Sequence, residues 1–92
     1  MSTLGELLSD LNDREVVFSL LAKGGDIAAI AGVNQAAHAS GRDPCDLAMD
    51  AVEAFTLKAD DEAWVKLIGR IQNADSPGGA CLSEIITWSL AR

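Results

Sequence analysis

The two cysteines, the single histidine and one of the three asparagines, Asn34, are the side chains of this sequence that we select as candidates for ligand binding or chemistry. Asn34 and His38 are one helical turn apart, and Cys45 and Cys81 each lie close to an expected helix start. The dipole of a helix lowers the pKa of a thiol in its first turn, and a neutral histidine nearby could take the thiol proton. Asn34, His38, Cys45 and Cys81 therefore form a candidate ligand-binding or metal-binding set, provided that the fold brings them into one pocket.

The alternative interpretation of the same residues is structural. Asn34 and His38 would then bond to each other or to a backbone carbonyl, and both cysteines would be semi-buried thiols. One histidine and two cysteines do not complete a structural zinc set, and the sequence contains no C-x-x-C, H-E-x-x-H, G-x-S-x-G or glycine-rich phosphate-binding motif. We therefore predict no catalytic residues, no metal site and no cofactor, and we do not expect an enzyme.

A line of carboxylates follows the helix start signal Asp43-Pro44. Asp43, Asp46, Asp50 and Glu53 recur at spacings of three, four and three residues, which places them on one face of a helix. Like charges at such spacings destabilise a helix by roughly 0.2–0.5 kcal/mol per pair, so their clustering on one face indicates a functional role for that face. We predict that this face binds a basic protein partner or, weakly, a divalent cation. The alternative is a solvated helix face without a partner.

The two ends of the chain carry more large apolar residues than a thin helical core needs. Leu4, Leu8 and Leu11 lie near one end, and Trp88 and Leu90 lie near the other. A chain of this size buries only about 60% of its unfolded surface, and spare apolar faces on small domains often mediate assembly. We therefore predict self-association as a homodimer, with Trp88 among the partner-binding residues. The alternative is that these side chains close the core of the monomer.

Composition and charge disfavour several classes of function. Of the 92 residues 49% are hydrophobic, 23% charged and only 4% aromatic, which is typical of a globular helical domain. Fourteen acidic and seven basic residues give a net charge of -7, so binding to nucleic acid or to an anionic membrane surface is not expected. No apolar run approaches the roughly 20 residues of a membrane span. With no secretory leader visible and no disulfide framework, we expect a cytoplasmic protein.

Residues 39–55 resemble the first helix of ribbon-helix-helix repressors, in which a short polar turn precedes an amphipathic helix. Those repressors read DNA with a basic strand that directly precedes this helix. In this chain the preceding residues 27–38 are alanine-rich and uncharged. The resemblance therefore implies no DNA binding, and no family is assigned from it.

Helix signals along the chain indicate the elements that position these residues. We expect helices in residues 4–11, 13–23, 27–39, 43–55, 60–71 and 80–91. Asp43-Pro44 and Asp60 are strong helix starts, and residues 73–79 form the longest loop. The alternative for residues 16–30 is a β-hairpin that turns at residues 23–26.

The predicted fold is all-α, a single domain over residues 1–92 with five or six short helices around the alanine-rich helix 27–39. Ile27, Ile30, Asn34 and His38 would share one side of that helix, and small residues such as Gly32 would occupy the other. Because neither side is charged, we expect this helix to be enclosed, with its small-residue side in close contact with a neighbour.

Overall fold

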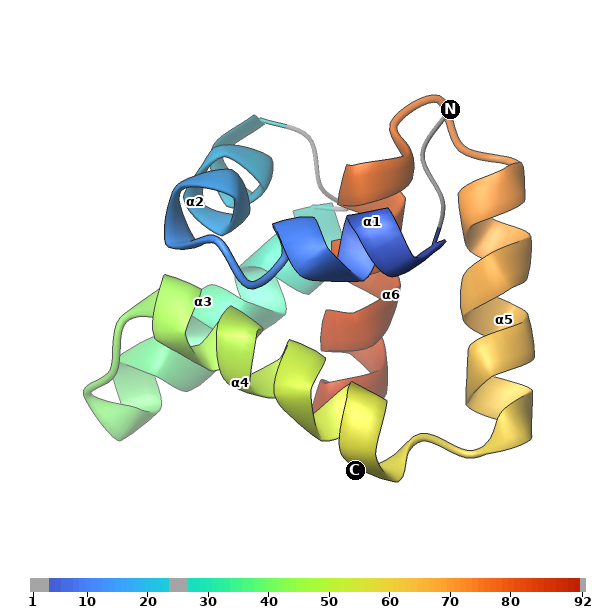
Figure 1. Cartoon of the computed structure of the whole chain (residues 1–92). Helices are drawn as coiled ribbons and strands as arrows, with labels where there is room; N and C mark the ends of the chain where they lie inside the picture. The colour runs from blue at the N-terminus through green and yellow to red at the C-terminus, as the bar shows by residue number, and fades with distance from the viewer. Residues whose placement is uncertain (1–3, 24–26, 92) are drawn as a thin grey trace.

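The computed structural model describes residues 4–23 and 27–91, and it folds them into helices joined by short turns (Figure 1). The elements are α1 (Leu4–Asp10), α2 (Arg14–Lys23), α3 (Ile27–Ser40), α4 (Pro44–Lys58), α5 (Asp61–Gln72) and α6 (Pro77–Leu90). The predicted all-α bundle is confirmed. The β-hairpin alternative for residues 16–30 is wrong, because α2 and α3 are helical on both sides of the expected turn, of which residues 24–26 lie outside the described part of the chain.

Local sequence signals place the predicted helix starts. The Asp43 carboxylate accepts a hydrogen bond from the backbone N–H of Cys45 at 2.8 Å, and Pro44 is the first residue of α4. The Asp60 carboxylate caps α5 by accepting from the N–H of Ala63 at 2.9 Å. A carboxylate at these positions satisfies N–H groups that have no partner inside the helix. α4 continues to Lys58, three residues beyond its expected end. The expected loop over residues 73–79 is wrong in its second half, because α6 begins at Pro77 and not at residue 80.

Gly41 ends α3 in the left-handed region, with φ of 70°. A Cβ atom added at Gly41 would have no neighbouring atom within 4 Å among the atoms that the structure describes, and the same is true at Gly69 in the interior of α5. The two glycines therefore differ in backbone conformation and not in available space. We expect Gly41→Ala to lower the free energy of unfolding by about 1 kcal/mol and Gly69→Ala to raise it by about 0.5–1 kcal/mol. Urea unfolding of both variants checks this, and a change of the same sign in the two would contradict it.

The centre of the bundle is occupied by α6. Each of the other described helices packs against α6, which stands between α5 and the remaining helices in Figure 1. The buried side chains of the core are Leu7, Leu11, Val17, Ala29, Val33, Cys45, Ala48, Ala51, Val52, Phe55, Leu67, Cys81, Leu82, Ile85 and Ile86. Within the described residues, no helix is both long and apolar enough to cross a membrane.

The expectation that helix 27–39 occupies the centre is wrong. α3 packs against α4 and α6 through the buried residues Ala29, Val33 and Ala37, while its other face is exposed, with Ile27 84% accessible to solvent. Alanine side chains remove little apolar area from water, so an uncharged helix made of them gains less from burial than α6 with its leucine and isoleucines. The expected close approach at the small-residue side does occur, because a Cβ at Gly32 would lie 2.5 Å from the Leu90 Cδ1.

Candidate interaction site

An apolar groove of about 200 Å³ lies between α2, α3 and the start of α4. We call it the Phe18 groove. Its lining consists of Phe18, Leu21 and Ala22 from α2, Ile30 and Asn34 from α3, and Asp43, Pro44 and Cys45 from the start of α4. Asn34 and Cys45, two of the four candidate ligand-binding residues, thus line the same groove.

The other two candidate residues lie elsewhere. His38 is exposed near the end of α3, and Cys81 is fully buried in the core on α6. Neither lines the Phe18 groove. Asn34 and His38 were expected on an enclosed side of α3, but both are exposed because that side faces solvent. In the described ranges, no three histidine, cysteine or acidic side chains are grouped so that they could hold a metal ion.

Both cysteines are free thiols whose environment disfavours the thiolate. The pKa of Cys45 is raised mainly by burial and also by the nearby Asp43 carboxylate, while Arg14 lowers it in part. Burial raises the pKa of Cys81 to about 11. The expected lowering of the Cys45 pKa by its helix start is therefore wrong, since desolvation and the adjacent carboxylate outweigh it. Protonated thiols are poor nucleophiles at neutral pH.

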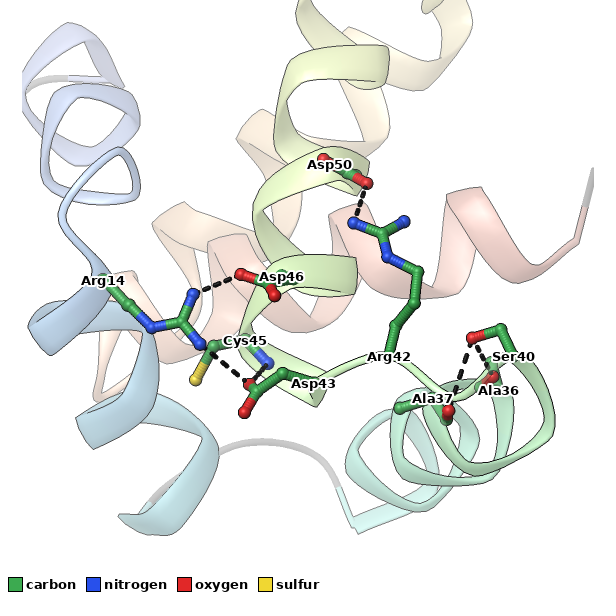
Figure 2. Close-up of polar contacts among 9 residues, drawn as sticks. All are labelled: Arg14, Ala36, Ala37, Ser40, Arg42, Asp43, Cys45, Asp46 and Asp50. Carbon is green, nitrogen blue, oxygen red and sulfur yellow. Dashed lines mark hydrogen bonds and ion pairs between the residues drawn. The ribbon is translucent and has the colours of Figure 1, made fainter.

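The predicted acidic face of α4 carries its own counter-charges. Figure 2 shows the Arg14 guanidinium between Asp43 and Asp46, with its Nη2 3.2 Å from the Asp43 Oδ1 and its Nη1 bonded to Asp46. Arg42, just before the helix, places its Nη2 2.6 Å from the Asp50 Oδ2. Three of the four predicted carboxylates are thus paired with arginines of the same chain, and the fourth, Glu53, is exposed on the next turn. This face therefore offers a basic partner less net charge than the sequence pattern suggests.

Comparison of the chain with protein-family models, with curated proteins and with solved structures finds no match. Function is therefore inferred from the geometry of the chain itself.

The predicted assembly residues at the chain ends are largely used inside the monomer. Leu11 is buried, with 1% of its surface exposed, and Leu4 and Leu8 pack partly against the core. The Trp88 ring contacts the Phe55 ring edge to face, with centroids 5.0 Å apart. Leu90 differs, because 46% of its surface is exposed. For the other residues, the contacts inside the monomer agree with the alternative interpretation.

Two exposed apolar residues that are not among the predicted site residues lie at the Phe18 groove or next to it. Phe18 lines the groove and leaves 66% of its surface exposed, and Ile27, 84% exposed, is one turn before Ile30 on α3. A sequence signal for Phe18 existed, because it falls outside the apolar face that Val17 and Leu21 share on α2. Ile27 gave no such signal, since its exposure follows from the surface position of α3.

Proposed function

We propose that this chain is a small non-catalytic interaction or regulatory protein that self-associates through the Phe18 groove. The observation that carries this proposal is the exposure of 66% of a phenylalanine that itself lines an apolar groove. A large aromatic side chain left in water at a concave surface is typical of a residue that becomes buried on binding.

The position of Phe18 suits a two-fold contact between copies. In a symmetric dimer the same patch is used on both subunits, so a residue that both projects and lines a groove can insert into the partner's groove while receiving the partner's residue. Charge permits this approach in spite of the overall charge of -7. Asp43 supplies the carboxylate of the groove lining, and Arg14 pairs with it and with Asp46.

Binding of a small ligand at Asn34 and Cys45 is the second candidate function, because the fold brings these two residues to one groove. The volume of about 200 Å³ favours an apolar side chain over a cofactor-sized molecule, since small-molecule sites typically measure about 300–1,000 Å³. His38 and Cys81 supply no further groups at this groove. We therefore rank the interaction function first.

We place the protein in the cytoplasm as part of the same proposal. Cys45 and Cys81 are both buried free thiols, which suits a compartment in which thiols stay reduced.

Sedimentation of the full chain over a range of concentrations tests self-association. We expect the wild type to form a dimer and Phe18→Ser to weaken dimerisation by about 100-fold, because each of two symmetry-related phenylalanines loses roughly 1.5 kcal/mol or more of burial. The matched control is Leu57→Ser, which removes an apolar side chain that is 73% exposed on α4, outside the groove. Circular dichroism verifies that both variants keep the helical fold.

Two results would overturn self-association through the groove. One is a wild type that remains a monomer at concentrations of several hundred micromolar. The other is an equal loss of dimer in Phe18→Ser and Leu57→Ser, which would assign assembly to general surface hydrophobicity.

A further inference from the structure

A second cavity, of about 350 Å³, lies between the first turns of α5 and the last turns of α6. We call it the Trp88 cavity. Its lining includes the half-buried Trp88 and the fully buried Phe55, together with the charged residues Asp60, Glu62, Lys66 and Glu84. Its volume is at the lower end of the range of about 300–1,000 Å³ that is typical of small-molecule sites. It shares no lining residue with the Phe18 groove, so the two sites are separate.

The aromatic part of the cavity is held rigidly by the core. Phe55 is fully buried and makes edge-to-face contacts with both tryptophans, with ring centroids 4.8 Å from Trp64 and 5.0 Å from Trp88. Trp88 is half-buried and lines the cavity, whereas Trp64 does not. The face of an indole ring attracts a cation within about 6 Å of its centre, more strongly than the ring of phenylalanine or tyrosine does.

The charges around the cavity are predominantly negative. Three carboxylates line it against one lysine, Lys66. Asp60 and Glu62 take part in no ion pair within the described ranges, unlike the arginine-paired carboxylates of α4. The Glu84 Oε1 lies 3.2 Å from the Arg70 Nε, so this ion pair offsets part of the negative charge that Glu84 brings to the cavity. The last residues of α6 add partial negative charge at the cavity, and the first turn of α5 adds partial positive charge, which the capping carboxylate of Asp60 offsets in part.

We propose that the Trp88 cavity receives a lysine or arginine side chain of a basic protein partner. The cationic group lies against the Trp88 indole and between the Asp60 and Glu62 carboxylates, and the methylene stem of the side chain covers the aromatic edge. This inference rests on the proposed interaction function and names the chemistry of its partner. The sequence pattern predicted a basic partner at the acidic face of α4, but arginines of the chain itself pair with carboxylates there. The Trp88 cavity is the better site for such a partner, because its exposed carboxylates form no ion pair with an arginine of the described residues.

The test uses N-acetyl-lysine methylamide and N-acetyl-arginine methylamide as probes and N-acetyl-glutamine methylamide as the uncharged control. Binding is followed by the NMR shift of the Trp88 indole N–H, with the Trp64 indole as an internal reference outside the cavity. We expect the cationic probes to move the Trp88 signal and to leave that of Trp64 nearly unchanged. Trp88→Phe keeps an aromatic ring against the core and is expected to bind the same probes about two-fold to three-fold more weakly.

A pair of charge-matched variants separates local recognition from general attraction to an acidic protein. Asp60→Asn with Glu62→Gln removes two cavity carboxylates, and asparagine preserves the cap of α5. Asp50→Asn with Glu53→Gln removes the same charge from the face of α4. We expect affinity to fall on the order of five-fold in the first double variant and by less than two-fold in the second.

Two outcomes would overturn the cation site. One is a Trp88 shift no larger with the cationic probes than with the glutamine probe. The other is an equal loss of affinity in the two double variants. Sedimentation of the double variant Asp60→Asn, Glu62→Gln tests self-association separately. We expect its dimerisation to be unchanged, so a failed cation site would not count against the dimer.

Discussion

Replacing Phe55 with alanine is expected to lower the free energy of unfolding by about 3–5 kcal/mol, the range for deleting a fully buried phenylalanine. Phe55 has no exposed surface, and its ring separates the two tryptophans through edge-to-face contacts. Its removal leaves a cavity where α4, α5 and α6 meet. Small domains have total stabilities of about 5–15 kcal/mol, so this variant should be close to unfolding at 37 °C.

Urea unfolding followed by far-ultraviolet circular dichroism measures this loss. Tryptophan fluorescence is a poor probe here, because both tryptophans touch the mutated residue. Leu57→Ala, two residues away on the same helix and 73% exposed, is the control and should change stability by no more than about 0.5 kcal/mol. A Phe55→Ala variant within 1 kcal/mol of that control would show that the aromatic cluster does not anchor the core.

Raising the pH from 9 to 11 is expected to destabilise the fold by on the order of 2 kcal/mol through Cys81 alone. Burial raises the pKa of this thiol from 9.0 to about 11 in the folded chain. The unfolded chain therefore loses the thiol proton first as the pH rises. The stability contributed by the protonated thiol is complete below pH 9, declines above it and is lost once the pH passes about 11.

The change in stability with pH isolates this effect better than stability at one pH. Cys81→Ala lowers stability at every pH by creating a small cavity, but it removes the ionisation of the thiol. The free energy of unfolding of the wild type should fall more steeply between pH 9 and 11 than that of the variant. Lysine deprotonation acts on both proteins and cancels in the difference. Equal slopes would mean that the folded chain lets the Cys81 thiolate form as readily as the unfolded chain does.

Helix limits were predictable because the interactions that set them are local. The carboxylates of Asp43 and Asp60 cap backbone groups within three residues, and Gly41 adopts a conformation that other residues avoid. Such signals operate within a short stretch of chain and can be recognised in the sequence alone. The same holds for the amphipathic face of α4, whose carboxylates do lie on the exposed side.

The candidate site was only partly predictable, because it depends on contacts between distant segments. Arg14 pairs with carboxylates about 30 residues away, and nothing in the local sequence specifies that pairing. Asn34 and Cys45 meet at the Phe18 groove, while His38 points to solvent and Cys81 enters the core. The exposure of Ile27 likewise follows from where α3 packs.

The helical class of the chain and most of its helix limits could be predicted from local sequence patterns, and the sequence contains no recognisable catalytic motif. The position of α6 at the centre, the solvent-exposed side of α3 and the pairing of Arg14 with Asp43 and Asp46 followed only from the packing of the helices. The physical reason is that capping and helical periodicity act over a few residues. The free energy gained by burial, in contrast, depends on the apolar area that each helix face removes from water in the packed bundle, which involves all helices at once.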